Sequence, residues 1–180
     1  MDKMRLGMDI RSIHFILLGI LSDGPKHGYQ IHKIINDPEG IGLIWKIKIT
    51  NIYGLLDVLE KKAYIEPADQ ISDDTSYPPK KYFKMTSNGE EVFKKWLSDP
   101  VKHGREMRQV FLSKMYFAAQ NDNALTHRLI DDQLAECKRW MQNSDQPAKS
   151  NPHYVRTVKS FRMMQFKSYI AWLEELKEQY

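Results

Sequence analysis

Cysteine is nearly absent from this sequence of 180 residues, in which Cys137 stands alone. A single thiol cannot form an internal disulfide, so we expect a protein of the reducing cytoplasm. The chain also lacks an apolar run near the roughly 20 residues that a membrane helix needs, and its first residues lack the apolar core of a secretory signal. We therefore expect no membrane partner.

The signatures of catalysis and of metal binding are missing as well. The six histidines are scattered, and none is paired with a second ligand at the spacing of a metal site. Cys137 lies in a predicted helix without a nearby histidine to activate it. The segment Gly40–Gly42 has neither the third glycine nor the preceding strand of a phosphate-binding loop. These absences predict a protein that is not an enzyme and that uses no metal and no cofactor.

The composition itself is that of an ordinary globular protein, with 42% apolar and 28% charged residues. The formal net charge is +4. Residues 1–100 hold 14 basic and 14 acidic side chains, so the whole positive excess lies in the last 80 residues. If the first half of the chain binds nucleic acid, it has to do so through local clusters of lysine.

The segment from Ile47 to Ile65 has the pattern of an amphipathic helix with Thr50 as its N-cap. Its apolar stripe consists of Ile52, Leu55, Leu56 and Leu59. The opposite face carries Thr50, Tyr53, Gly54, Asp57 and Lys61. Short polar groups near the beginning of a helix are what a recognition helix needs to reach into the major groove. Most helices with these features only cover a core. Whether this one is a recognition helix therefore has to be judged from the elements on either side of it.

Those neighbouring elements predict a winged helix-turn-helix domain over residues 1–100. Helices are expected over 10–21, with Asp9 as a cap, and over 27–36. After the helix at Thr50, two short strands over 64–67 and 80–85 enclose a polar loop that holds Asp69, Asp73, Asp74 and Pro78-Pro79. A capping box of Ser87 and Glu90 then opens a helix that stops at Asp99-Pro100. The order of these elements is more specific than any one of them.

Residues 101–180 are predicted to form an all-helical domain, with helices over 105–120, 123–142 and 153–178 and a loop over 143–152. The last helix has more apolar residues than packing against one neighbour requires. It is either a core helix buried on two sides or a helix with one face in its own core and one against a second copy, and we favour the second interpretation. The residues assigned to this dimer are Val158, Phe161, Phe166, Tyr169, Ile170, Trp172, Leu173 and Leu176. The predicted fold class is mostly α, a winged helix-turn-helix followed by an all-α dimerisation domain.

Four motifs resemble the PadR-type transcriptional regulators. His27-Gly28-Tyr29-Gln30-Ile31 resembles their HGYEI signature, and the segment from Thr50 to Glu60 matches the spacing of their recognition helix. Lys80–Gly89 is similar to their second wing strand. The opening of the helical C-terminal domain in one PadR subfamily is resembled by Arg108, Phe111, Leu112, Lys114, Met115 and Phe117. The first three motifs cover residues 10–98 in the right order.

The resemblance implies a homodimer, joined through its C-terminal helices, that binds a two-fold related operator in duplex DNA. Two departures matter, because Gly54 and Asp57 lie where many members carry a basic residue, and the wing loop is acidic rather than basic. We predict that DNA is contacted by Lys46, Lys48, Thr50, Asn51, Tyr53, Gly54, Lys80, Lys81 and Lys84, and by the helix start at His27, Gly28 and Tyr29.

The sequence therefore predicts a cytoplasmic, dimeric, sequence-specific DNA-binding regulator, with repression as its expected action. We allow for a small-molecule effector, whose identity no residue indicates. The alternative is a winged helix that serves only as a dimerising scaffold for protein interactions. The neutral first half and Asp57 favour this alternative, whereas lysines at the positions that a winged helix uses for phosphate favour DNA binding.

Overall fold

The computed structural model describes residues 10–68, 80–121, 123–144 and 153–180. Its contacts divide the chain into two compact units, with the boundary between Trp96 and Leu97, and each unit is described by itself. The predicted cap Asp9, the wing loop with Asp69, Asp73, Asp74 and Pro78-Pro79, and residues 145–152 of the predicted loop lie outside the described residues.

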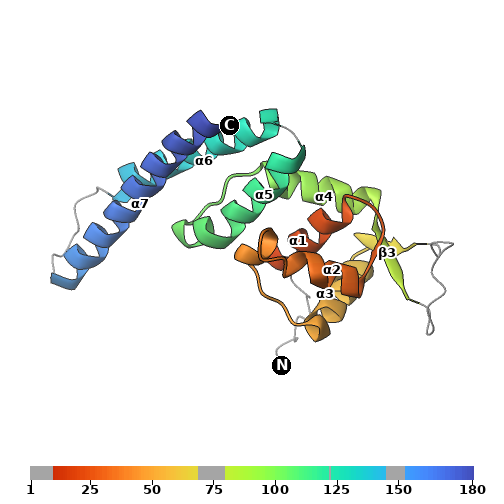
Figure 1. Ribbon diagram of the computed structural model, residues 1–180. Helices are drawn as coiled ribbons and strands as arrows, with labels where there is room; N and C mark the ends of the chain where they lie inside the picture. Colours follow the sequence, from red (N-terminus) through yellow and green to blue (C-terminus); the bar gives the residue numbers. More distant parts are fainter. Residues whose placement is uncertain (1–9, 69–79, 122, 145–152) are drawn as a thin grey trace, which may run out of the picture. The chain divides into compact units, whose positions relative to one another are not determined.

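The first unit has the element order of a winged helix (Figure 1). Three helices pack on one another, and a small sheet and a fourth helix follow. The elements are α1 (Ser12–Leu21), β1 (Lys26–His27), α2 (Gly28–Ile35), a 3₁₀ turn (Ile41–Leu43), α3 (Ile49–Lys61), β2 (Ile65–Pro67), β3 (Tyr82–Met85) and α4 (Ser87–Ser98). The predicted winged helix-turn-helix is confirmed.

The wing is a three-stranded antiparallel sheet in the order β1-β3-β2. The pairing of β2 with β3, Ile65 opposite Met85, confirms the two predicted strands. β1 was not predicted, because two residues are too short to show the period of a strand. It places His27 opposite Tyr82, so His27 ends a strand as well as preceding α2.

Two predicted helix caps are displaced by one or two residues. α3 begins at Ile49, and Lys48 is its N-cap without a side-chain hydrogen bond, so Thr50 lies inside the first turn. α4 begins at Ser87, and the preceding Thr86 caps it. The Thr86 hydroxyl accepts the Gly89 N–H at 3.1 Å and donates to the Ala63 carbonyl at 2.7 Å. Thr86 therefore fastens the start of α4 to the end of α3.

The core of the first unit is aliphatic. Its fully buried members are Ile16, Leu17, Leu18, Ile31, Ile35, Ile41, Ile52, Leu56, Leu59 and Ile65. The predicted apolar stripe of α3 is therefore confirmed as the face that packs inward. Burial of such side chains contributes about 1.5–3 kcal/mol each.

The second unit is helical in all its described elements. It contains a 3₁₀ turn (Gly104–Glu106), a π-helical turn (Met107–Phe111), α5 (Leu112–Asn121), α6 (Asn123–Ser144) and α7 (His153–Gln179). α6 and α7 run antiparallel, since Asp131 pairs with Lys177 and Lys138 pairs with Glu174. The long final helix is confirmed, whereas the π turn was not predicted.

No described helix is long and apolar enough to cross a membrane. Within the described ranges, no group of three or more histidine, cysteine or acidic side chains could hold a metal ion. The thiol of Cys137 is buried on α6, and this burial raises its pKa to about 11. At neutral pH the thiol is therefore protonated and unreactive.

Candidate nucleic-acid interface

The polar face of α3 is exposed along its first two turns. Thr50, Asn51, Tyr53, Gly54 and Asp57 all face solvent, and the apolar stripe lies on the other side of the helix. Short uncharged groups therefore occupy the start of the helix, and Asp57 comes only in the third turn. The carboxylate of Asp57 is paired with the Lys61 ammonium at 2.6 Å, which offsets its charge. The negative charge that Asp57 brings to this face is therefore partly neutralised by Lys61.

Tyr53 lies across the start of α2. A side-chain carbon added to Gly28 would come within 2.7 Å of the Tyr53 ring, so only glycine leaves the ring in this place. Tyr53 keeps 53% of its surface exposed, and the neighbouring Tyr29 keeps 64%. Two accessible phenol groups therefore stand near the beginnings of adjacent helices. Tyr29 was predicted to contact DNA as part of the start of this helix, and the structure shows in addition that its side chain is exposed.

His27 is less available than predicted. Its ring is buried and packs edge-on against Tyr82, with ring centroids 5.2 Å apart. Its backbone N–H already donates to the Gln30 side chain at 3.0 Å. The first-turn N–H groups of Gly28 and Tyr29 remain as candidates for a phosphate.

The segment before α3 is held by Asn36. The Asn36 amide accepts the Ile47 N–H at 3.2 Å and donates to the Ile47 carbonyl at 3.0 Å. It also donates to the His32 carbonyl at 2.9 Å, so Asn36 links the end of α2 to the chain just before α3. Lys46 and Lys48 flank this point, and both are exposed and make no ion pair within the described residues. They are well placed to meet a phosphate backbone.

The wing lysines have partners inside the protein. The Lys81 ammonium lies 2.8 and 2.9 Å from the two Glu60 oxygens and 4.8 Å from the centre of the Phe83 ring. Lys84 pairs with Glu66 at 3.2 Å. Lys80 is exposed at the start of the described part of the wing. The positive charge of the wing is therefore smaller than the sequence alone suggests.

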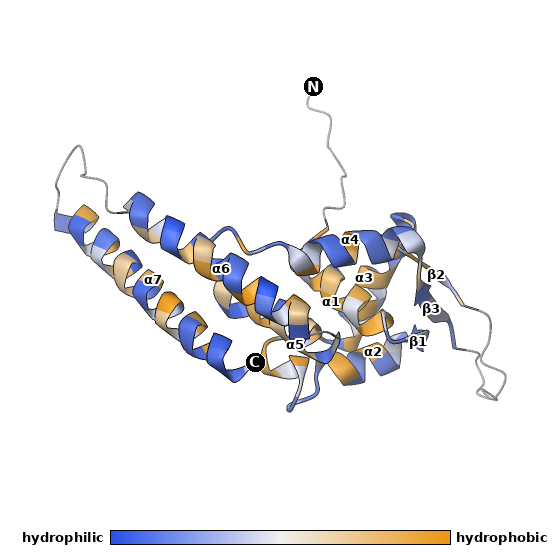
Figure 2. Cartoon of the chain, turned by 90° about the horizontal axis from the view of Figure 1, so that it is seen from above, coloured by the Kyte–Doolittle hydropathy of each residue, from blue (hydrophilic) through white to orange (hydrophobic). Residues whose placement is uncertain are grey.

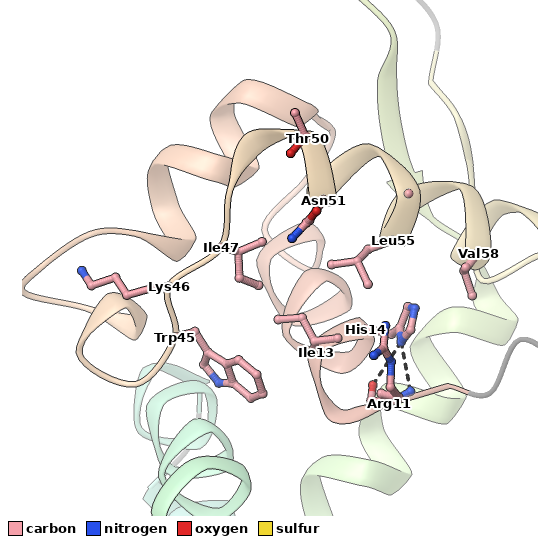
Figure 3. Close-up of a pocket in the computed structure, with 11 residues that line it drawn as sticks. Arg11, Ile13, His14, Trp45, Lys46, Ile47, Thr50, Asn51, Leu55 and Val58 are labelled. Carbon is pink, nitrogen blue, oxygen red and sulfur yellow. Dashed lines mark hydrogen bonds between the residues drawn. The ribbon is translucent and has the colours of Figure 1, made fainter.

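A cavity of about 660 Å³ lies beside α3, on the side of α1 (Figure 3). Its lining consists of Arg11, Ile13, His14, Trp45, Lys46, Ile47, Thr50, Asn51, Gly54, Leu55 and Val58. Figure 3 shows that the Arg11 backbone and the His14 ring are hydrogen-bonded at its edge. The other ring nitrogen, Nε2 of His14, has no hydrogen-bond partner among the described residues. Burial lowers the pKa of His14, so the ring is neutral at physiological pH.

The dimer residues predicted on α7 fall into two groups. Leu173 is fully buried within its own unit, so its assignment to a dimer interface is wrong. Trp172 packs edge-on against Phe111, Phe166 lies beside Trp140, and the Tyr169 hydroxyl donates to the Gly104 carbonyl. The predicted set combined residues from two faces of α7, because the spacing of apolar residues alone does not show which face packs against α6.

The outward group lies in the first half of α7. Phe161 is 62% exposed, and Tyr154 and Met164, which the predicted set omitted, are 76% and 65% exposed. Val158 is half-buried between them along the helix. Figure 2 shows hydrophobic segments interleaved with hydrophilic ones along α7. Ile170 and Leu176 are half-buried and closer to the covered side.

The chain is similar to a known protein family and to several solved structures. Residues 17–95 match the sequence model of the transcriptional regulator PadR-like family. No curated protein matches the chain. Among solved structures, PadR from Bacillus subtilis in complex with operator DNA has 22% identity and a TM-score of 0.47, covering 96% of this chain and 99% of its own.

Two further structures have similar coverage. A PadR-like transcriptional regulator from Bacillus cereus has 18% identity and a TM-score of 0.42, over 94% of this chain and 97% of its own. The virulence activator AphA from Vibrio cholerae has 17% identity and a TM-score of 0.41, over 93% and 96%.

Proposed function

Because the winged-helix unit of this chain belongs to the PadR-like family of transcriptional regulators, we propose that the protein controls transcription by binding duplex DNA through α3 and the wing. The single observation that carries this proposal is the exposed face of Thr50, Asn51 and Tyr53 at the start of α3, inside the matched segment. A regulator of this kind works by occupancy of DNA in the cytoplasm and needs no catalysis.

Base reading falls to Asn51. An asparagine amide makes two hydrogen bonds to adenine in the major groove, which discriminate against other bases by about 1–3 kcal/mol. Thr50 and Gly54 flank Asn51 on the same face, one as a hydroxyl donor and one as a place where DNA can approach the helix closely. Base contacts at one end of the helix then define the operator sequence.

Backbone contacts fall to the tyrosines, the lysines and the start of α2. The hydroxyls of Tyr29 and Tyr53 can donate to phosphates, as can the N–H groups of Gly28 and Tyr29. Lys46 and Lys48, which form no ion pair with any residue that the structure describes, supply positive charge before α3. Lys81 and Lys84 would exchange their Glu60 and Glu66 partners for phosphate. This exchange costs little, because exposed ion pairs contribute only about 0–1 kcal/mol.

We further propose a homodimer that binds a two-fold operator and represses transcription from it. Tyr154, Phe161 and Met164 support the dimer, since exposed aromatic and methionine side chains along one helix are typical of an interface. A dimer with a two-fold axis presents two copies of α3 to two half-sites. Occupancy of the operator by such a dimer would block access of the polymerase.

The test is a fluorescence anisotropy titration of the full chain with the DNA upstream of its own gene and with a scrambled duplex. Asn51→Ala should weaken binding to the operator by about 1–3 kcal/mol and leave binding to the scrambled duplex unchanged. Asn88→Ala, which removes an exposed asparagine from the first turn of α4, is the matched control. Equal losses on both duplexes would make Asn51 a positioning residue. Failure to bind either duplex would support the scaffold alternative.

A small-molecule effector would fit the cavity beside α3. The cavity shares Thr50 and Asn51 with the DNA-reading face, and the neutral ring of His14 forms part of its wall. A ligand there would compete with the contacts that hold α3 in place. Candidate compounds can be screened by the melting temperature of the native protein against the Val58→Trp variant, in which the added ring reduces the cavity. A compound that stabilises both proteins equally binds elsewhere.

A further inference from the structure

The chain enters the helical unit through a short connecting segment, residues 99–103. The boundary between the two units lies just before this segment, between Trp96 and Leu97. Such a segment is flexible when its backbone groups face water, and rigid when they are hydrogen-bonded inside the protein. The partners of its N–H and carbonyl groups therefore show how firmly the segment belongs to the helical unit.

Gln133 of α6 holds the middle of the connecting segment. Its side-chain oxygen accepts the Val101 N–H at 2.7 Å, and its side-chain nitrogen donates to the Val101 carbonyl at 3.3 Å. The same nitrogen donates to the Cys137 sulfur at 3.8 Å, so the whole amide has partners. Gln133 and Val101 are both buried. Both backbone groups of Val101 are therefore paired where water does not reach them.

The start of the connecting segment is held by Lys114 of α5. The Lys114 ammonium is buried and donates to the Asp99 carbonyl at 2.5 Å. Pro100, which follows, has no N–H that needs a partner, and its ring fixes one of its backbone angles. Its ring also restricts the backbone of Asp99 to extended conformations. The first half of the segment therefore has little freedom to move.

The end of the connecting segment is held by Glu106. The Glu106 carboxylate accepts the N–H groups of Lys102 and His103 at 3.1 and 3.0 Å. The Glu106 N–H in turn donates to the His103 carbonyl at 2.9 Å. The N–H groups of residues 101–103 therefore all have partners, and these partners lie within the helical unit.

A glutamine is an unexpected residue at this position of α6. Leu129, Ile130 and Cys137, three or four positions away along the helix, are fully buried and apolar. An apolar side chain in place of Gln133 would avoid the cost of removing an amide from water, but it would leave both backbone groups of Val101 without partners. A buried polar group with all its hydrogen bonds made selects one arrangement of the chain. Gln133 is therefore suited to fixing the path of the connecting segment.

We propose that Gln133 is a positioning residue for DNA binding and determines which spacing of half-sites the protein accepts. Together with Lys114, it makes the connecting segment a rigid part of the helical unit. In a dimer, two DNA-binding units on rigid connecting segments reach two half-sites at one separation. Flexible segments would accept several separations. The inference rests on the proposed function of a dimer that binds DNA.

The first measurement is hydrogen exchange of the full chain without DNA, followed by mass spectrometry. The amides of residues 101–103 should exchange slowly, because they are hydrogen-bonded. Gln133→Met keeps the length of the side chain and removes its hydrogen bonds, so exchange in the connecting segment should become about tenfold faster or more. Gln142→Met, which replaces an exposed glutamine of α6, should leave this exchange unchanged. Unchanged exchange in folded Gln133→Met would overturn the proposal.

The second measurement is the affinity for three duplexes by fluorescence anisotropy. They are the site that the protein protects upstream of its own gene, the same site lengthened between its half-sites by half a helical turn (roughly five base pairs), and one half-site alone. The unaltered protein should prefer the natural spacing by about tenfold or more. Gln133→Met should reduce this preference and leave the affinity for one half-site unchanged. An unchanged preference, or an equal loss on all three duplexes, would overturn the proposal.

The two measurements separate this inference from the proposed function. If the unaltered protein binds none of the duplexes, the proposed function fails and the spacing role fails with it, whereas hydrogen exchange still tests the rigidity of the connecting segment. If the unaltered protein binds both spacings equally, only the spacing role fails. Melting temperatures show whether Gln133→Met is folded. If it is not, Lys114→Met, which releases the Asp99 carbonyl alone, should give the same two changes.

Discussion

At the scale of single residues, Lys114 is a buried cation that links two segments of the helical unit. Its ammonium donates to the Asp99 carbonyl at 2.5 Å, which fastens the segment after α4 to α5. Burial lowers the pKa of Lys114 to about 8, against the opposing effect of the Asp99 and Glu106 carboxylates. The folded protein therefore holds this proton less tightly than the unfolded chain does.

From this difference we expect the free energy of unfolding to rise with pH between about 8 and 10.5. The added stability is on the order of 3 kcal/mol. It is complete above the Lys114 pKa of the unfolded chain, 10.5, and it is lost as the pH falls to and through the Lys114 pKa of the folded protein, about 8. Lys114→Met should abolish this rise in urea unfolding across the window. Lys167→Met, on the exposed side of α7, should retain it. An unchanged rise in the Lys114→Met protein would disprove the assignment.

Asn36 is the residue on which the position of α3 depends. Asn36→Ala would leave both the N–H and the carbonyl of Ile47 without their partner, at a cost of about 1–3 kcal/mol in the free energy of unfolding. DNA affinity should fall equally on operator and scrambled duplexes, because Lys46 and Lys48 lose their fixed place. Asn36→Asp keeps the acceptor for the Ile47 N–H, so its stability and its DNA affinity should lie between those of the original protein and of Asn36→Ala. Denaturant unfolding and DNA titration of the three proteins measure this order.

At the scale of elements, the sequence was sufficient where a repeating pattern existed. The stripe from Ile52 to Leu59 identified α3 and its buried face, and the paired strands identified most of the wing. β1 and the π turn were missed because a two-residue strand has no period and a π turn has the composition of an α-helix. The helix starts at Ile49 and Ser87 were misplaced because capping depends on local backbone geometry as well as residue type.

The candidate site was predictable to the same degree. The exposed polar face of α3 follows from the helical period. The Lys81–Glu60 pair spans 21 positions of the chain, so it exists only once the wing has folded beside α3. In the same way, the residues of α7 that face α6 could not be separated from those that face outward until the packing was known.

The exposed half of α7 gives a prediction about assembly. Phe161→Glu with Met164→Glu should convert the proposed dimer into a monomer, because a buried unpaired carboxylate costs several kcal/mol at an interface. Sedimentation velocity measures the change in mass. Gln142→Glu adds a carboxylate to the exposed side of α6 and should not alter assembly. A dimer that survives both changes in α7 would require another interface.

At the scale of the whole molecule, the net charge of +4 says little about where DNA binds, because the excess lies outside the first 100 residues. What matters is which cations lack an internal partner. Lys46 and Lys48 are such cations among the described residues, whereas Lys81 is offset by Glu60. Local charge and net charge therefore give different expectations for the salt dependence of binding.

Lys46→Ala with Lys48→Ala should reduce the slope of log affinity against log salt by about 2, since each released phosphate contact contributes roughly 0.9. Lys81→Ala should reduce it by less than about 1, because Glu60 competes with the phosphate for the same ammonium. The slopes are measured by anisotropy over a salt series. Equal slopes in all three proteins would place the phosphate contacts on other residues.

The contact of Tyr53 with Gly28 has a consequence in genetics. Alanine at position 28 would push the Tyr53 ring aside without touching the core, so the mutant protein should accumulate normally and yet fail to regulate. Such an allele would be epistatic with any allele that removes the ring. The double mutant Gly28→Ala, Tyr53→Ala should be no more defective in a reporter strain than Tyr53→Ala alone. The effects of mutations in two codons that are 25 apart would then be non-additive.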